Sequence, residues 1–186
     1  MPFIILVAGI PASGKTTYSK HIASKLSVVL IGKDAIKSVL YEALQWDNSN
    51  RAVGQAHGKA ASFVMYHIAD EIMKTGGNLV VESNFPPYSA DVFRGLAEKH
   101  GYSAITVLCD ADSAVLFKRY YEREDTNERH DGLRGLRIDL EQFTKETQPL
   151  RDFCVGRKLI LDTTNLNRID YNTIDNEILK YLEDGQ

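Results

Sequence analysis

The sequence predicts an α/β fold in which one parallel β-sheet carries helices on both faces. Short runs rich in valine, isoleucine and leucine are typical of strands buried on both faces, and helical patterns separate these runs. The runs span residues 3–8, 28–31, 79–81, 104–109 and 159–161. Alternating strands and helices are connected by right-handed crossovers, which put helices on both sides of an open sheet. In such sheets ligands bind beyond the carboxyl ends of the strands.

The length and composition favour one ordinary globular domain that spans residues 1–186. A chain of 186 residues fits one domain, and 44% hydrophobic with 25% charged residues excludes a disordered or fibrous class. The net charge of -3 and the pI near 6.0 argue against extended nucleic acid as a partner, because such proteins usually carry a basic stripe. Nothing in the composition predicts an oligomeric state.

The first apolar run and the cysteine content predict a cytoplasmic protein with no membrane partner. Residues 3–8 are far fewer than the roughly 20 apolar residues that a membrane-spanning helix needs. Cys109 and Cys154 are too few and too far apart for a disulfide framework. We therefore expect two reduced thiols in the core.

The clearest helical pattern lies between the second and third predicted strands. Apolar residues recur there with the 3.6-residue period of a helix, and Gly76 and Gly77 end the pattern. This predicted apolar face consists of Val53, Ala56, Ala60, Phe63 or Val64, Ile68 and Ile72.

A carboxylate follows four of the five predicted strands, so the corresponding edge of the sheet is rich in acidic groups. Asp34 and Glu82 follow the second and third strands, and Asp110 and Asp162 follow the fourth and fifth. For Asp110 and Asp162 we favour turn and capping roles, which are common for acidic residues at such places. Asp112 and Asp170 are predicted to cap the helices that follow them.

The loop after the first strand matches the Walker A pattern, a glycine-rich segment that binds phosphates. Its glycines let backbone N–H groups surround an anion, and the helix that starts near Lys15 directs its positive dipole end to the same place. Lys15 is expected to reach the β- and γ-phosphates, and the Thr16 hydroxyl is the expected Mg²⁺ ligand. The predicted phosphate-binding residues are Gly9, Ile10, Pro11, Ala12, Ser13, Gly14, Lys15, Thr16 and Thr17.

Base-reading motifs of guanine-specific switch proteins are absent, which argues against a GTPase. The segments GIPASGKTT, IGKDAIK, VVESNF, FKRYYERE and LDTTN occur in an order that resembles P-loop kinases grouped around polynucleotide 5′-kinases, chloramphenicol phosphotransferase and zeta toxins, particularly their small uncharacterised members. The resemblance covers nearly the whole chain. It implies a P-loop NTPase fold of the nucleoside-kinase-like type, a sheet ordered 2-3-1-4-5, ATP as phosphoryl donor and Mg²⁺.

The resemblance places Asp34 where an aspartate of the family faces the acceptor hydroxyl. A carboxylate there orients the attacking hydroxyl and accepts its proton as the new bond forms. We therefore predict that Asp34 is catalytic and contacts the acceptor, across the phosphate site from the P-loop. The alternative is that Asp34 caps a helix over residues 35–44.

Glu82 takes a position where many relatives carry an aspartate, which is a departure from the family pattern. Its longer side chain is predicted either to hold Mg²⁺ through a bound water or to contact the acceptor. Ser83 and Asn84 follow in a loop toward the same edge, and Asn84 is a candidate acceptor ligand. Turn formation before Pro86 is the alternative for both.

Residues 118–137 are dense in charges of both signs and are predicted to form a small arginine-rich lid. Arg119 and Arg123 are four residues apart and share one helix face, so both are predicted to act on phosphates when the lid closes. Arg129 and Arg134 align less securely with the family. A solvated helix face with internal ion pairs is the alternative.

Gly54 and Gly58 flank His57 on the long helix, which suggests a close approach of its backbone to another group. In the architecture that the resemblance implies, this helix lines the acceptor side. Arg51 and His57 are therefore candidate acceptor contacts, although a lone helical histidine is more often a packing or surface residue.

Together these features predict an ATP-dependent kinase that transfers the γ-phosphoryl group to a hydroxyl of a small metabolite or nucleoside-like acceptor. A 5′-polynucleotide kinase and a zeta-toxin-like nucleotide-sugar kinase are alternatives within the same chemistry. A module that binds ATP as a switch, without an acceptor, is the alternative from another class.

Overall fold

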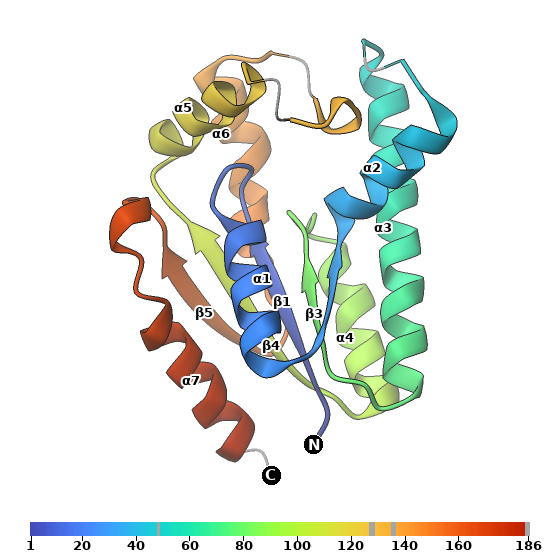
Figure 1. The fold of residues 1–186 in the computed structure, drawn as a ribbon, viewed down its shortest axis with the longest axis vertical. Coiled ribbons are helices and arrows are strands. Elements are labelled where there is room, and N and C mark those ends of the chain that lie inside the picture. The colour runs from blue at the N-terminus through green and yellow to red at the C-terminus, as the bar shows by residue number, and fades with distance from the viewer. Residues whose placement is uncertain (48, 127–128, 135–136, 185–186) are drawn as a thin grey trace.

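The computed structural model describes residues 1–47, 49–126, 129–134 and 137–184. Its centre is a parallel five-stranded sheet in the order β2-β3-β1-β4-β5, as the sequence predicts (Figure 1). The strands are β1 Phe3–Gly9, β2 Val29–Gly32, β3 Leu79–Glu82, β4 Ser103–Asp110 and β5 Arg157–Asp162. Each lies within two residues of its predicted bounds.

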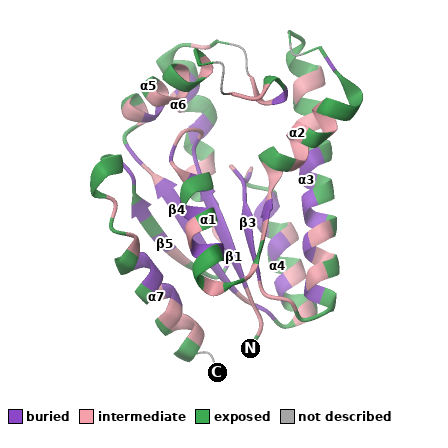
Figure 2. Cartoon of the chain, viewed as in Figure 1, coloured by how far each residue is buried: buried purple, intermediate pink, exposed green. Residues whose placement is uncertain are grey.

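The central strands are buried on both faces, but the two edge strands are not. Side chains of β1, β3 and β4 are almost entirely buried (Figure 2). By contrast, Val29 of β2 and Ile160 of β5 are exposed. The prediction of two buried faces was therefore wrong for β2 and β5. Each edge strand pairs on one side only, so part of its surface meets solvent.

Two pairs of helices cover the sheet. Alternate residues along each strand point to opposite faces, which gives two separate cores. One core joins the strands to α3 and α4, and the other joins them to α1 and α7. The helices are α1 Lys15–Leu26, α2 Lys33–Leu44, α3 Arg51–Lys74, α4 Ser89–His100, α5 Ser113–Glu124, α6 Leu140–Thr147 and α7 Tyr171–Asp184, and the 3₁₀ turns are η1 Asp131–Leu133, η2 Gln148–Asp152 and η3 Leu166–Arg168.

Helix α3 exists as predicted and ends at Lys74, just before the two glycines, but its predicted apolar face was wrong in part. Phe63 and Val64 are exposed, as are Ala56 and Ala60. Two alanines, two methionines, a serine and a tyrosine face inward in their place, where α3 packs against β2 and β3. The buried residues are Ala61, Ser62, Met65, Tyr66, Ala69 and Met73.

Three of the four acidic residues that were assigned to turns and caps occupy those roles, whereas the fourth, Asp110, forms an ion pair. Asp112 accepts from the N–H of Ala114 at the start of α5, and Asp170 accepts from Asn172 at the start of α7. Asp110 pairs with Arg151, with Oδ2 and Nε 2.9 Å apart. Asp162 accepts from the N–H of Thr164.

A separate layer lies above the carboxyl ends of the strands. Helices α5 and α6 stand over β4, and the segment that carries η1 reaches across to α2 (Figure 1). A small apolar cluster around Leu116 and Phe143 holds this layer together. Within the described residues, no helix is long and apolar enough to cross a membrane.

Candidate functional site

The loop between β1 and α1 has the backbone geometry of an anion cradle. Gly9 and Gly14 have φ angles of 146° and 82°, which favour glycine. A Cβ on Gly9 would lie 2.2 Å from the carbonyl oxygen of Cys109, so β4 approaches too closely for any side chain. Gly14 offers no side-chain cap to α1, so the first N–H groups of that helix point toward an anion site.

The Lys15 side chain lies against the loop and not in open solvent. Its Nζ donates to the carbonyl oxygen of Ile10 at 3.0 Å, and the residue is buried. Burial lowers the pKa of this amine, and the nearby charges of Glu82 and Asp34 oppose that change. A bound phosphate would give Lys15 the counter-charge that its burial demands.

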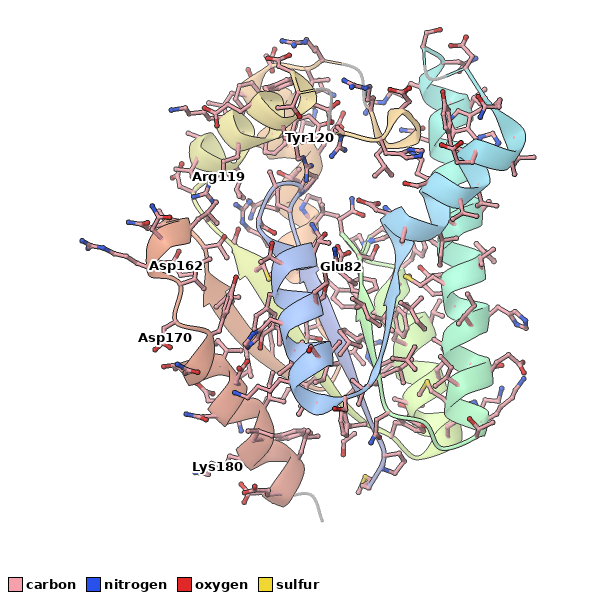
Figure 3. The ribbon with its side chains drawn as sticks, viewed as in Figure 1. Glu82, Arg119, Tyr120, Asp162, Asp170 and Lys180 are labelled. Atoms are coloured by element: carbon pink, nitrogen blue, oxygen red, sulfur yellow. The ribbon has the colours of Figure 1, made fainter. Side chains whose placement is uncertain are left out.

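Glu82 ends β3 beside the start of α1 (Figure 3). It is buried, and its Oε2 accepts from the Thr16 hydroxyl over a long 3.4 Å. Burial raises the pKa of Glu82, and the charge of Lys15 opposes the rise only in part. A buried carboxylate with one weak hydrogen bond has oxygen lone pairs that remain available to a ligand.

One cavity of about 640 Å³ joins the P-loop to the layer above it, within the usual size range of small-ligand sites. Its walls come from the P-loop, the start of α2, the end of β3 and the underside of α5. The predicted site residues that line it are Pro11, Ala12, Gly14, Lys15, Thr16, Thr17, Asp34, Glu82, Asn84, Arg119 and Arg123.

Asp34 lies in the first turn of α2 and is not its cap. The helix begins at Lys33, Gly32 is the capping residue, and no side chain caps it. The alternative in which Asp34 caps a helix from Ala35 is therefore wrong. The Asp34 carboxylate, 51% exposed at its side chain, opens onto the cavity.

Positive charges around Asp34 keep it ionised. Desolvation raises the pKa of this carboxyl, but the charges of Lys33, Lys15 and Arg129 outweigh it and lower the pKa below its usual range. Lys33 Nζ lies 3.5 Å from Asp34 Oδ1 and donates to Asn84 Oδ1 at 2.7 Å. Lys33 therefore contacts both Asn84, the predicted acceptor ligand, and Asp34, the predicted base.

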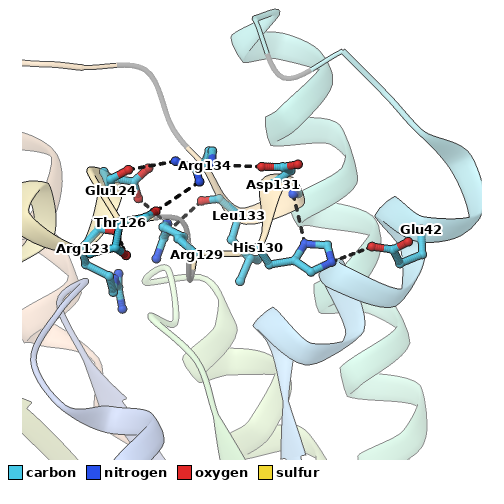
Figure 4. Close-up of polar contacts among 10 residues, drawn as sticks. Glu42, Arg123, Glu124, Thr126, Arg129, His130, Asp131, Leu133 and Arg134 are labelled. Carbon is cyan, nitrogen blue, oxygen red and sulfur yellow. Dashed lines mark hydrogen bonds and ion pairs between the residues drawn. The ribbon is translucent and has the colours of Figure 1, made fainter.

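The two predicted lid arginines behave differently. Arg119 donates to the carbonyl oxygens of Thr163 and Thr164 at 2.8 and 2.7 Å, which fixes its guanidinium against the loop after β5. Arg123 has no such anchor among the described residues. Figure 4 shows its guanidinium pointing away from the other lid residues, and it lines the cavity. Arg123 is therefore better placed than Arg119 to meet a phosphoryl group.

The remaining lid arginines are held by protein groups (Figure 4). Arg129 pairs with Glu124 and donates to the carbonyl oxygen of Leu133, although it also lines the cavity. Arg134 donates to Asp131 and to the carbonyl oxygen of Glu124. These contacts build the described part of the predicted lid.

The two candidate acceptor contacts on α3 lie apart from the main cavity's described lining. Arg51 pairs with Glu146, with Nη2 and Oε1 2.6 Å apart. His57 stacks on Trp46 with ring centroids 4.0 Å apart, and its Nδ1 lies 2.8 Å from the carbonyl oxygen of Val53. This geometry favours a packing role for His57, and its contact with an acceptor stays a prediction.

The sequence analysis did not single out several residues that line the cavity. Lys33 and Lys37 belong to α2, Tyr120 to α5, and the exposed Leu166 to the turn after β5. Three of them lie in or next to the segments IGKDAIK and LDTTN. The order of motifs therefore indicated this region of the site but not the individual residues.

The residues present fit a nucleotide with its metal. The Ser13 hydroxyl is buried in the loop and has no hydrogen-bond partner within the described part of the chain. The Thr16 hydroxyl and the Glu82 carboxylate are oxygen donors, the type that Mg²⁺ prefers. The described residues contain no cluster of three acidic, histidine or cysteine ligands, so phosphate and water oxygens would complete the coordination.

Known proteins match the chain in sequence and in fold. Residues 4–150 match the family model of the AAA domain designated AAA_33. A crystal structure from Chloroflexus aurantiacus, assigned as a kinase, is 31% identical and superposes with a TM-score of 0.83 over 100% of this chain and 98% of that chain.

More distant matches show the same fold or a shared segment. A shikimate kinase from Bacteroides thetaiotaomicron is 20% identical, with a TM-score of 0.61 and coverage of 97% and 98% of the two chains. A protein of Autographa californica nuclear polyhedrosis virus, assigned as a bifunctional polynucleotide kinase/RNA ligase, is 25% identical over 129 residues. That match covers 66% of this chain and 18% of the viral protein's length.

Proposed function

Because the chain belongs to the AAA domain family of P-loop kinases, we propose that it transfers the γ-phosphoryl group of ATP to a hydroxyl of a small-molecule acceptor. One observation carries the proposal. One cavity joins a phosphate cradle, through Lys15, to an ionised carboxylate, Asp34, and to the Arg123 guanidinium, which no described residue anchors. Kinases of small metabolites are among the solved structures with this fold.

Each side of the cavity has a distinct task in this reaction. The P-loop N–H groups and Lys15 bind the phosphates, for which Lys15 leaves the carbonyl of Ile10. Asp34 orients the acceptor hydroxyl and receives its proton as the bond to phosphorus forms. Arg123 stabilises the negative charge that grows on the transferred group.

The metal has a place among the same residues. Thr16 and Glu82 would hold Mg²⁺, which neutralises phosphate charge when bound. The burial that raises the pKa of Glu82, and the single long hydrogen bond that it accepts among the described residues, from Thr16, support a metal ion at this carboxylate. Transfer should therefore require Mg²⁺, and undiminished transfer in excess chelator would contradict this role.

The direct test is a phosphate-transfer screen with labelled ATP against pools of hydroxyl metabolites. We expect Mg²⁺-dependent labelling of one acceptor class by the wild-type protein. Lys15→Ala should remain folded in thermal melts and lose ATP binding and transfer, because Lys15 neutralises phosphate charge. Full activity of Lys15→Ala would refute a P-loop kinase.

The viral match favours a 5′-hydroxyl polynucleotide as a second candidate acceptor. The net charge of -3 argues against it, because a nucleic-acid site usually carries a surplus of basic groups. A 5′-hydroxyl oligonucleotide belongs in the screen for this reason. Labelling of the oligonucleotide above all metabolites would replace the small-molecule proposal.

A further inference from the structure

A second cavity, of about 240 Å³, adjoins the first one. Lys37, Tyr120 and Leu133 line both, so these three side chains stand between them. The far wall of the second cavity comes from the start of α3 and from α6, where Arg51 and Glu146 lie. The roles proposed above for Lys15, Asp34 and Arg123 do not use this space, and Arg51 is the predicted acceptor contact that lines it.

Two glycines of α3 open onto the two cavities. Gly58 lines the first and Gly54 lines the second, and they share one helix face because they are four residues apart. Apart from their own helix backbone, no heavy atom of the described chain lies within 4 Å of a Cβ built on either glycine, so both face open space. Glycine within a helix is less stable than alanine, and at these two positions it leaves open space for a ligand.

The second cavity carries more positive than negative charge. Lys37, Arg51 and Arg134 line it together with the single carboxylate of Glu146. Arg134 is committed to Asp131 and to backbone carbonyls. Among the described residues Arg51 gives one bond, to Glu146, and a guanidinium has five N–H donors, so the others have no partner in this part of the chain.

Lys37 is the cation that stands out between the cavities. Its ammonium makes no hydrogen bond or ion pair within the described part of the chain, and its nearest ring contact is Trp46 at 5.9 Å. Lys37 follows Asp34 by three residues, so both share one face of α2 and lie about 4.5 Å apart along the helix axis.

We propose that the second cavity binds an anionic group of the phosphoryl acceptor. The acceptor is then a small hydroxyl compound that also carries a phosphate or carboxylate. Its hydroxyl lies at Asp34, and its anionic group contacts Lys37 and the free N–H donors of Arg51. This inference rests on the proposed kinase function and narrows its acceptor class.

The test compares matched compounds by calorimetry while ADP and Mg²⁺ saturate the P-loop. The probes are sugar phosphates and hydroxy acids of three to six carbons, each with its free sugar or amide as the neutral partner. We expect one charged compound to bind at least about tenfold more tightly than its neutral partner. The sugar-phosphate and hydroxy-acid arms distinguish a phosphate from a carboxylate.

Two variants with matched controls locate the binding. Lys37→Gln should bring the charged and neutral partners within about threefold, whereas Lys59→Gln, an exposed lysine of α3, should keep the preference. Gly54→Leu should fill the cavity and weaken the charged compound, whereas Ala60→Leu at an exposed position should not. ADP affinity and thermal melts confirm that each variant is folded. Where Gly54→Leu does not fold, Lys37→Gln alone tests the inference.

Three results would overturn the inference: equal binding of the neutral partners, an undiminished preference in Lys37→Gln, or binding of none of the charged compounds. Its failure is distinguishable from failure of the kinase function. Lys15-dependent transfer to a neutral acceptor would keep the kinase and refute the anion site. Lys37-dependent binding without any transfer would keep the anion site and refute the kinase.

Discussion

Helix α1 meets two buried carboxylates that differ in how well they are satisfied. At its start, Glu82 is 5% exposed and accepts one 3.4 Å bond from Thr16. Further along, Asp175 of α7 is fully buried and is contacted by three side chains of one face of α1. They are the Tyr18 hydroxyl at 3.0 Å, His21 Nε2 at 2.7 Å and Lys25 Nζ at 2.8 Å.

The pKa values of the two carboxyls move in opposite directions. Burial raises the pKa of Glu82, and nearby cations offset this only in part. Burial acts the same way on Asp175, but hydrogen bonds from Lys25, His21 and Tyr18 outweigh it and lower the pKa. A carboxylate with three partners fastens α7 to α1, whereas one with a single weak bond among the described residues is a candidate ligand-binding group.

The comparison predicts that substitutions near the cavity change activity, and that substitutions at Asp175 change stability. The largest expected effect belongs to Asp34→Asn, which keeps the shape and removes the proton acceptor. Transfer should fall by about 10²–10⁴, the usual contribution of a general base. Single-turnover transfer with the identified acceptor measures this fall, and ATP titration should show nearly unchanged affinity.

Asp91→Asn is the matched control, because Asp91 lies exposed in the first turn of α4 as Asp34 lies in that of α2. An acidic residue in a first turn contributes roughly 0.3–1 kcal/mol through the helix dipole, so both variants should melt slightly below wild type. A wild-type transfer rate in Asp34→Asn would remove its role as a base.

Arg123→Ala should give the next largest effect. Removal of one donor that stabilises transition-state charge costs about 10²–10³ in kcat. Arg123→Lys should recover part of that loss, because an ammonium lacks the planar fork of a guanidinium. Lys118→Ala, at an exposed position of α5, is the control. Steady-state kinetics that show equal kcat for all these variants would make the predicted lid a solvated helix.

At the other cluster, Asp175→Asn should lower stability by about 1–3 kcal/mol, the usual worth of hydrogen bonds to a charged group. For a chain of this length each kcal/mol corresponds to roughly 2–4 °C in Tm. Transfer below the melting range should stay at the wild-type rate. Asp184→Asn, at the exposed end of α7, controls for charge loss. An unchanged melting temperature in Asp175→Asn would contradict a structural role.

The order of strands and the phosphate cradle could be predicted from sequence because both depend on local pattern. Buried parallel strands are short apolar runs, and a Walker A loop must follow one of them. The buried face of α3 could not be predicted in this way. Close packing on the sheet selects Ala61 and Ala69 over the larger Phe63. A period of 3.6 residues identifies a helix but leaves the exact buried face open when apolar residues occur all round.

Site residues could be predicted where they belong to a sequence motif. They could not be predicted where contacts between distant segments determine how the side chain is held. Lys15, Thr16, Asp34 and Glu82 line one cavity as the order of motifs predicts. The anchoring of Arg119 to the loop after β5 depends on two carbonyl oxygens more than forty positions away. No spacing rule separates such an arginine from Arg123, so sequence alone treated the two alike.

The smallest expected effect is a gain in stability from Glu82→Gln. The folded state raises the pKa of Glu82 above its usual 4.5, so folding favours the protonated carboxyl. The ionised group therefore lowers stability at neutral pH, and glutamine removes that penalty at the same shape. The variant should melt at or above wild type at pH 7, and the difference should shrink as the pH falls toward 4.5.

Asp175 has the opposite sign, since its stabilising charge is present above its usual pKa of 3.8 and is lost only as the pH falls through the lowered value. Thermal melts from pH 7 to 3 on wild type and both variants separate the two contributions.

The same Glu82→Gln protein distinguishes the two proposed roles of Glu82. A metal ligand requires more Mg²⁺ for half-maximal transfer, whereas an acceptor ligand raises the acceptor KM at saturating Mg²⁺. A variant less stable than wild type at pH 7 would show that Glu82 is satisfied by the protein itself.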